Sequence, residues 1–221
     1  MNAVDLRLYG IVDPGRTGGR DPVPLAAAAV AGGCTLIQYR DKEADTRTFV
    51  ARARSLKAAL AGTRVPLLVN DRVDVALAAE ADGVHVGQDD MHAADARRLL
   101  GPEAIVGLTI KTPAQADELY RLPVDYACIG GVFPTASKAN AEPPVGLDGF
   151  SRIAFRARLA GGKLPVGAIA GIDHTNAAAV IAAGADGVAV ISAIFAAEDV
   201  AAAARRLRAI IDQALAARGA L

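Results

Sequence analysis

The sequence predicts a single α/β domain over residues 1–221, folded as a (β/α)8 barrel of the TIM type. Three observations predict this fold. Short apolar runs alternate eight times with longer, alanine-rich stretches of helical period. The apolar runs show no polar alternation, which is typical of parallel strands covered by helices. The length of 221 residues lies toward the compact end of the range for such barrels.

A doubly wound open sheet would use the same alternation, but eight units favour closure because a closed barrel has no exposed edge strands. The first four strands are expected over Leu8–Val12, Thr35–Tyr39, Val65–Val69 and Gly83–Val86. The helices that follow them are expected over Pro24–Ala31, Thr46–Ala61, Val73–Ala79 and Ala93–Leu100. In the second helix, apolar residues recur at helical spacing at Phe49, Val50, Ala53, Leu56, Ala59 and Leu60.

The last four units follow the same pattern. Their strands are expected over Ala104–Leu108, Tyr126–Ile129, Val166–Ile169 and Gly187–Ile191. Their helices are expected over Pro113–Tyr120, Leu147–Leu159, Asn176–Ala183 and Val200–Ala217. The irregular stretch from Gly130 to Gly146 is long for a strand–helix connection, and such loops usually bind ligands or cover a site.

Composition excludes several classes of partner. The 24 basic and 24 acidic residues balance to a net charge of zero, which argues against bulk electrostatic binding of nucleic acid or anionic membranes. The two cysteines, Cys34 and Cys128, lie far apart, so neither a disulfide framework nor a zinc site is expected. No signal peptide is recognisable, and no apolar run reaches the roughly 18 residues of a membrane span. We therefore expect a cytoplasmic protein, with a homo-oligomer left open.

A faint internal repeat links the two halves of the chain. The segment Ala81–Val86 recurs as Ala185–Val190, so that Asp82 and Asp186 occupy equivalent positions. A weaker copy begins at Asp125. Each aspartate precedes an apolar strand, and we expect these residues to stabilise the turn and the start of the strand, away from the site.

Polar residues gather where the strands end, which is where barrels of this type carry their chemistry. Arg40 and Lys42 follow the second strand, and this pair could hold an anion. Asp71 follows the third strand, and Asp89 and Asp90 follow the fourth. Neighbouring strands lie about 4.8 Å apart, so Asp71 should approach Asp89 or Asp90. Two converging carboxylates predict a Mg²⁺ site completed by substrate phosphate and water.

The histidines do not suggest a metal site. His85 lies within a strand, where we expect a packed, hydrogen-bonded core residue, and His92 and His174 are expected at the surface near helix starts. The donor-rich loop after the sixth strand contains Thr135, Ser137 and Lys138. Gly171 and Ser192 follow the seventh and eighth strands, where many barrels bind phosphate with backbone N–H groups.

The barrel mouth is therefore expected to bind anions at two ends. One end combines the carboxylate pair and Mg²⁺ with Arg40, Lys42 and Lys138, and suits a diphosphate. The other end is the backbone phosphate site of the last two loops. This arrangement suggests an enzyme that joins or splits two phosphorylated small molecules, with diphosphate as the leaving group.

These motifs resemble those of the thiamin-phosphate synthase family. The resemblance covers nearly the whole chain in the order of the family and is carried by Gln38–Lys42, Val69–Asp71, Ala81–Asp90, Phe133–Lys138 and Gly184–Ile194. It implies that a 4-amino-2-methyl-pyrimidinylmethyl diphosphate loses diphosphate with the help of Mg²⁺. The resulting carbocation is captured by the nitrogen of a hydroxyethyl-methylthiazole phosphate, which gives thiamin phosphate.

The resemblance also implies roles for individual residues. Those implied to hold the pyrimidine diphosphate are Gln38, Tyr39, Arg40, Asp41, Lys42, Asn70, Thr109 and Lys138, with Arg40, Lys42 and Lys138 as catalytic residues. Asp71 and Asp90 are implied as Mg²⁺ ligands. Those implied to hold the thiazole phosphate are Thr135, Ala136, Ser137, Gly171, Ile191 and Ser192.

Three positions depart from the pattern of the family. Thr109 stands where the family usually has serine, and Ala170 replaces the first glycine of a Gly-Gly-Ile segment. Lys111 stands where many relatives have histidine. The related thiazole tautomerases are thought to use a histidine in that loop, so Lys111 argues against a tautomerase. A non-catalytic phosphate-binding regulator is the third hypothesis.

Overall fold

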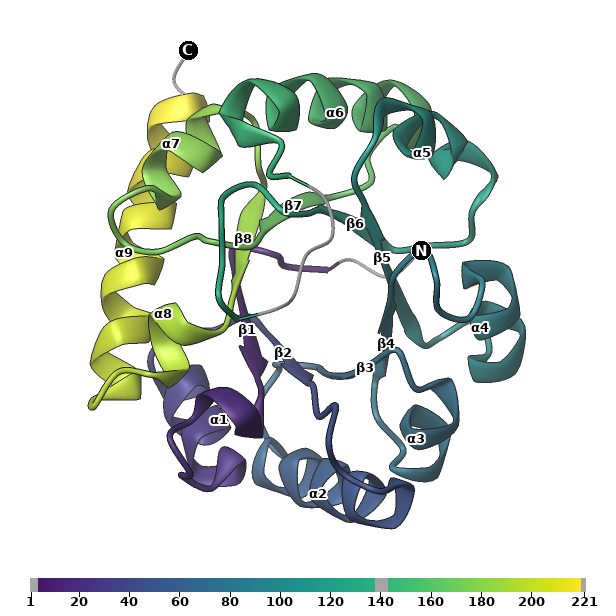
Figure 1. Cartoon of the computed structure of the whole chain (residues 1–221), viewed down its shortest axis with the longest axis vertical. Helices are drawn as coiled ribbons and strands as arrows, with labels where there is room; N and C mark the ends of the chain where they lie inside the picture. Colours follow the sequence, from purple (N-terminus) through teal and green to yellow (C-terminus); the bar gives the residue numbers. More distant parts are fainter. Residues whose placement is uncertain (1–3, 138–142, 220–221) are drawn as a thin grey trace.

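Eight parallel strands form a closed barrel in chain order, and β8 pairs back onto β1. The structure is a computed structural model that describes residues 4–137 and 143–219. Figure 1 looks along the barrel axis, with the ring of strands inside a ring of helices. The predicted (β/α)8 barrel is therefore confirmed, and the open doubly wound sheet is not formed.

The elements follow the expected order. The strands are β1 (Leu8–Val12), β2 (Leu36–Tyr39), β3 (Leu67–Asn70), β4 (Gly83–Val86), β5 (Ile105–Ile110), β6 (Tyr126–Ile129), β7 (Val166–Ile169) and β8 (Gly187–Val190). The helices are α1 (Pro22–Ala31), α2 (Thr46–Ala59), α3 (Val73–Ala78), α4 (Ala93–Leu100), α5 (Pro113–Asp117), α6 (Gly146–Gly161), α7 (Ala177–Ala182), α8 (Ser192–Phe195) and α9 (Val200–Gly219).

The differences from the sequence prediction are local. β3 begins at Leu67 instead of Val65, directly after Pro66, which has no N–H for a strand ladder. The helix expected over Pro113–Tyr120 ends at Asp117 and continues as the 3₁₀ helix η2 (Glu118–Arg121). α8 and the 3₁₀ helix η1 (Pro14–Arg16) were not predicted, because three or four residues are too few to show a helical period.

Alternate residues of each strand point into the barrel. The inward side chains form their own apolar cluster, which contains Val4, Leu6, Tyr9, Ile11, Leu36, Leu68, Ile105, Tyr126, Cys128 and Ala189. Val4 and Leu6 precede β1 and close the amino end of the barrel. The outward side chains pack against the helices as a second, larger core, as Phe49 of α2 does against Tyr39 with ring centroids 5.0 Å apart.

Side-chain acceptors fix the start of every odd-numbered strand. The Oδ2 atoms of Asp82, Asp125 and Asp186 accept hydrogen bonds from backbone N–H groups at the starts of β3, β5 and β7, at 2.7, 2.9 and 2.9 Å. Thr35 Oγ1 likewise accepts a hydrogen bond from the backbone N–H of Leu8, the first residue of β1, at 3.1 Å. The three aspartates therefore stabilise the starts of strands, but each holds the neighbouring earlier strand and not the strand that follows it, as the repeat had led us to expect. Thr35 plays the same role and is not part of the repeat.

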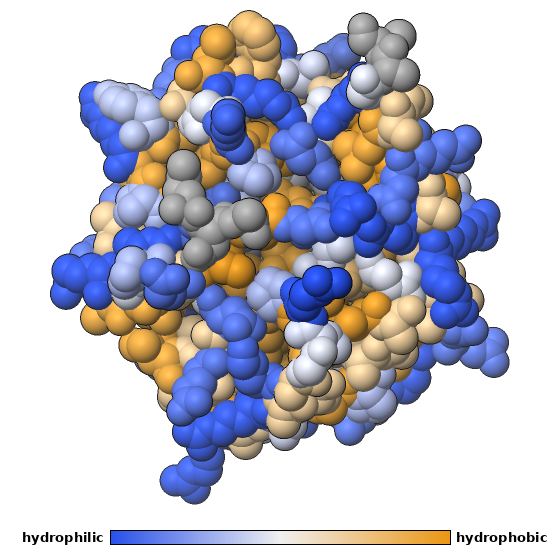
Figure 2. Space-filling view, turned by 180° about the vertical axis from the view of Figure 1, so that it is seen from behind, coloured by the Kyte–Doolittle hydropathy of each residue, from blue (hydrophilic) through white to orange (hydrophobic). Residues whose placement is uncertain are grey.

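The amino end of the barrel carries hydrophilic residues around a partly hydrophobic centre (Figure 2). An open cleft of about 830 Å³ lies at this end and is lined by residues of α2 and of the turns around β3 and β4. Its Lys57 and Asp82 already form an ion pair at 2.5 Å, and Asp82 also serves the start of β3. The cleft is therefore part of the structural face of the barrel.

In the described part of the chain, no helix combines the length and the apolar character that a membrane crossing requires.

We expect Asp125→Ala to lower the free energy of unfolding by about 3 kcal/mol, because it leaves the Val106 N–H and the Arg97 guanidinium without their buried acceptor. Asp125 is 1% exposed. Asp95→Ala is the matched control, since its carboxylate forms an exposed pair with Arg98 and should cost less than about 0.5 kcal/mol. Urea unfolding of both variants measures the difference, and equal small losses would contradict the structural role of Asp125.

Candidate active site

A cavity of about 680 Å³ opens at the carboxyl ends of the strands. Each of the eight strands, or the loop that follows it, contributes to the wall. The sequence-predicted site residues that line it are Gln38, Arg40, Asn70, Asp71, Asp90, Thr109, Thr135, Ala136, Ser137, Gly171, Ile191 and Ser192. Residues that are far apart in the chain therefore line one cavity, as we predicted from their positions at the ends of the strands.

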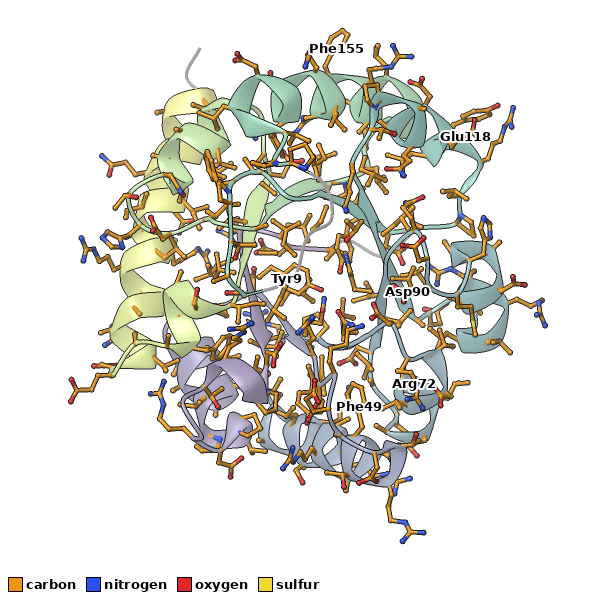
Figure 3. The ribbon with its side chains drawn as sticks, viewed as in Figure 1. Tyr9, Phe49, Arg72, Asp90, Glu118 and Phe155 are labelled. Carbon is orange, nitrogen blue, oxygen red and sulfur yellow. The ribbon has the colours of Figure 1, made fainter. Side chains whose placement is uncertain are left out.

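The two carboxylates converge at one side of this cavity. Asp71 follows β3 in a left-handed backbone conformation with φ 61°, and its N–H donates to the His85 carbonyl at 2.8 Å. Asp90 Oδ2 accepts the Gly87 N–H at 2.8 Å. Partial burial and the neighbouring Asp71 carboxylate raise the pKa of Asp90 above its ordinary value. Figure 3 shows Asp90 on the α4 side of the barrel mouth.

Lys42 supplies the positive charge beside this pair. Its Nζ lies 2.5 Å from Asp71 Oδ2, and half of the Lys42 side chain is exposed. The Lys42 ammonium group thus lies against the Asp71 carboxylate, where a metal cation could also bind. Because its side chain is half exposed, Lys42 has room to move away from Asp71. Asp89 is exposed and does not line the cavity, so Asp90 is the partner of Asp71.

The donor set fits Mg²⁺. This ion prefers carboxylate oxygens, and it usually takes one or two from the protein while water and substrate phosphate supply the rest. Among residues 4–137 and 143–219, no group of three or more His, Cys, Asp or Glu side chains could hold a metal. Asp71 and Asp90 would therefore bind the ion together with oxygens from outside the described protein.

Arg40 is held in place by Asp13, a residue that the sequence analysis missed. Its Nη1 donates to Asp13 Oδ2, and the two side chains are only 14% and 8% exposed. Asp13 also accepts the Gly15 N–H at 2.9 Å and so begins η1. A buried carboxylate thus orients one edge of the guanidinium while Arg40 lines the cavity.

Tyr39, Asp41 and Lys42 do not line the cavity, although all three were expected to hold the substrate, and of these only Lys42 reaches a lining residue, through Asp71. Alternate strand residues face opposite ways, so Gln38 points inward and Tyr39 points outward. The Tyr39 hydroxyl donates to Asp41 Oδ2 at 2.9 Å, and burial raises the pKa of Tyr39. Asp41 also accepts the Ala44 N–H at 3.0 Å, so this pair shapes the loop that carries Lys42.

Loops 6 and 7, which follow β6 and β7, are joined by backbone contacts at the other side of the cavity. The N–H groups of Val132 and Phe133 donate to the carbonyls of Ile169 and Ala170 at 3.0 and 3.1 Å. Gly171 has φ 68°, and a Cβ there would lie 2.5 Å from the Pro134 carbonyl oxygen and 2.6 Å from Phe133 Cβ. Glycine is therefore required at 171 both for its conformation and for the close approach of the two loops.

Ala170 is also left-handed, with φ 81°, although alanine rarely adopts this conformation. Loop 6 reaches the start of α8 through Ser137, whose hydroxyl lies 3.4 Å from that of Ser192. Lys138 lies outside the described residues, so its predicted contact with diphosphate stays a prediction.

Several residues that the sequence did not assign to the site also line the cavity. Arg16 and Lys111 line the cavity from the loops after β1 and β5, and His174 lines it from the loop after β7 although it is exposed, as predicted. Arg16 lies in the loop after the first strand, so the rule that strand ends carry the site could have found it. His85 also lines the cavity, but it is 4% exposed and hydrogen-bonded through both ring nitrogens, as expected of a packed core histidine.

The fold and the polar cavity at the strand ends define the protein as a (β/α)8-barrel enzyme. Residues 8–194 match the sequence model of the thiamine monophosphate synthase family. The chain is 53% identical to the thiamine-phosphate synthase of Agrobacterium fabrum over 99% of both chains. It is 48% identical to that of Chloroflexus aurantiacus, over 95% of this chain and 94% of the relative.

Solved structures agree with this relationship. The thiamine phosphate pyrophosphorylase of Pyrococcus furiosus superposes with a TM-score of 0.83 at 37% identity, over 96% of this chain and 98% of the other. A 3-hexulose-6-phosphate synthase, at 19% identity and a TM-score of 0.64, shares the fold. The chain therefore belongs to the thiamine monophosphate synthase family. It is a transferase of thiamine biosynthesis with the thiamine-phosphate synthase activity of that family.

We expect Gly171→Ala to lower the free energy of unfolding by about 2–3 kcal/mol, because the new Cβ adds overlap with loop 6 to backbone strain. Gly62→Ala is the matched control, since Gly62 has φ 81° and a Cβ added there would meet nothing within 4 Å. It should show the strain alone, about 1 kcal/mol. Urea unfolding of both variants measures the loss of free energy of unfolding. Equal losses in the two variants would mean that loop 6 moves aside for the Cβ at 171 at no cost.

Proposed function

We propose that the enzyme condenses 4-amino-2-methyl-5-pyrimidinylmethyl diphosphate with hydroxyethyl-methylthiazole phosphate to give thiamin phosphate and diphosphate. The observation that carries the proposal is the pairing of two different anion sites in one cavity. Asp71 and Asp90 form one side, with Lys42 paired to Asp71, and Gly171, Ser137 and Ser192 form the other. The first side suits a metal-bound diphosphate, and the second suits a monophosphate.

The proposed reaction breaks one bond and forms one bond. The bond between the pyrimidinylmethyl carbon and the diphosphate oxygen breaks, and its electron pair leaves with the diphosphate. The lone pair of the thiazole ring nitrogen then forms the new C–N bond, which leaves the positive charge on the thiazolium product. Mg²⁺ bound by Asp71 and Asp90 would stabilise the negative charge that develops on the diphosphate.

The side chains of the chain itself bind and orient the diphosphate. Arg40 offers a planar fork of N–H donors, and Asp13 holds that fork in one orientation before the substrate arrives. Lys42 can exchange Asp71 for a phosphate oxygen, because its side chain is half exposed. We assign the same role to Lys138, and we assign contacts with the pyrimidine half to Asn70, Gln38 and Thr109.

A dissociative, carbocation route suits the acid–base groups of this site. The attacking nitrogen carries no proton, so no general base is needed. Both nitrogens of His85 are engaged, with Tyr126 at 2.8 Å and Thr109 at 2.7 Å. This engagement supports a positioning role for His85 in place of proton transfer.

The first test mixes the purified protein with both phosphorylated heterocycles and Mg²⁺, with and without a chelator, and measures thiamin phosphate. We expect product only when free Mg²⁺ is present. Product that forms equally well in the chelator would overturn the metal assignment. Absence of product with thiazole phosphate still bound would overturn the synthase and favour a thiazole tautomerase or a binding protein.

The second test removes one charge from the carboxylate pair. We expect Asp90→Asn to lower Mg²⁺-dependent turnover at least about 100-fold, because the amide is a poor ligand for a hard cation. Asp89→Asn should keep turnover within about threefold, since Asp89 does not line the cavity. Steady-state rates over a Mg²⁺ titration, with circular dichroism to verify folding, give the comparison. Wild-type turnover of Asp90→Asn with unchanged Mg²⁺ dependence would remove Asp90 from the metal site.

A further inference from the structure

A chain of five hydrogen-bonded side chains crosses the interior of the barrel beneath the cavity. It runs from Gln38 on β2 through Tyr9, Tyr126 and His85 to Thr109 on β5, and its central hydroxyls and imidazole are buried. Figure 3 shows Tyr9 at the centre of the ring of strands. Gln38 and Thr109, at the two ends, line the cavity together with His85, whereas Tyr9 and Tyr126 do not.

Glycine at 107 makes one link of this chain possible. Gly107 lies between His85 and Tyr126 in the strand register. A Cβ at this position would lie 2.1 Å from Tyr126 Cζ and 2.3 Å from its hydroxyl oxygen. The missing side chain lets the Tyr126 hydroxyl reach His85 Nδ1 at 2.8 Å, across the strand that separates them.

The direction of every bond follows from the first one. The Gln38 amide Nε2 can only donate, so Tyr9 accepts at that link. Among the described residues the Tyr9 hydroxyl contacts only Gln38 and Tyr126, so Tyr126, at 2.9 Å, is the one acceptor for its proton. The Tyr126 hydroxyl accepts that proton, and His85 Nδ1 is then the acceptor for its own. His85 must therefore carry its proton on Nε2, from which it donates to Thr109 Oγ1 at 2.7 Å.

The two ends consequently present opposite polarity to the cavity. The Thr109 hydroxyl accepts from His85, so its own proton is available to a ligand in the cavity that Thr109 lines. The Gln38 amide uses Nε2 inside the barrel, so its carbonyl oxygen is the acceptor that remains. Within residues 4–137 and 143–219 every buried side-chain nitrogen or oxygen has a partner, so the chain has no internal gap at which its direction could change.

We infer that Tyr9, Tyr126 and His85 are positioning residues that fix Thr109 as a hydrogen-bond donor and Gln38 as an acceptor. An aminopyrimidine edge matches this polarity, because its ring nitrogen accepts and its exocyclic amine donates. The match to the pyrimidine rests on the function proposed above. The direction of the chain does not, since it follows from contacts within the protein.

Long-range ¹H–¹⁵N spectra of the ligand-free protein test the direction. The chain has three histidines, so His92→Asn and His174→Asn suffice to assign His85. We expect one His85 tautomer in the wild type, with the proton on Nε2, and a mixture of tautomers in Tyr126→Phe. A proton on Nδ1 in the wild type, or an unchanged tautomer in Tyr126→Phe, would overturn the inference.

Kinetics test the consequence for binding. Tyr126→Phe should raise KM for the pyrimidine diphosphate about 5–10-fold, the effect of one neutral hydrogen bond, while KM for the thiazole phosphate stays within about twofold. Tyr9→Phe cuts the chain one step earlier and should raise the same KM, which keeps the test available if Tyr126→Phe folds poorly. An equal rise in both KM values would contradict a role specific to the pyrimidine.

Cys128→Ala is the matched control for packing. Cys128 is fully buried in the same inner cluster, and it has no part in the hydrogen-bonded chain. The variant should unfold at a lower urea concentration yet keep the His85 tautomer and both KM values. A shift of tautomer in Cys128→Ala would show that general loosening of the core, and not the Tyr126 hydroxyl, sets the direction. Absence of synthase activity in the wild type would overturn the proposed function while leaving the tautomer test intact.

Discussion

The structure depends on the hydrogen bond that begins each odd-numbered strand. A parallel barrel can close only if its strands keep a fixed stagger, because a slip of one residue turns every inward side chain outward. Thr35, Asp82, Asp125 and Asp186 each hold an N–H at the start of an odd-numbered strand and so fix that stagger. These contacts also determine where the side chains of the cavity at the opposite end are placed, because each site residue has a fixed position relative to the end of a strand.

The site joins groups that are costly to hold near each other in the absence of a ligand. Two carboxylates approach at one end, Asp71 takes a left-handed backbone conformation, and Ala170 does the same where loops 6 and 7 meet. Strain of this kind persists only where the surrounding structure over-determines it. Here the surrounding structure is the ring of strands, together with partners such as Asp13, which keeps Arg40 directed at the cavity.

Much of the fold and of the site followed from the sequence, because both depend on the position of residues relative to strand ends. Asp71, Asp90 and Gly171 could be placed in this way. The segment Gln38–Lys42 could not be treated as one unit, since the two-residue period of a strand sends Tyr39 and Asp41 away from the cavity that Gln38 and Arg40 line. The roles of Asp13 and Gly107 depend on partners distant in the chain, Arg40 for the first and Tyr126 for the second, and no local pattern records them.

The four acceptors and the strands that they hold fall into two groups, one in each half of the chain. Thr35 with Leu8 and Asp82 with Leu67 lie before Gly101, while Asp125 with Val106 and Asp186 with Val166 lie after it. A break in the turn between α4 and β5 would leave all four of these contacts inside one fragment or the other. Each half of the chain thus contains the hydrogen bonds that set its own strand stagger. The two halves meet at the β4–β5 and β8–β1 pairings and through the ion pair of Arg97 with Asp125. In this respect the barrel is two half-barrels, each with its own pair of acceptors, joined at the turn between α4 and β5.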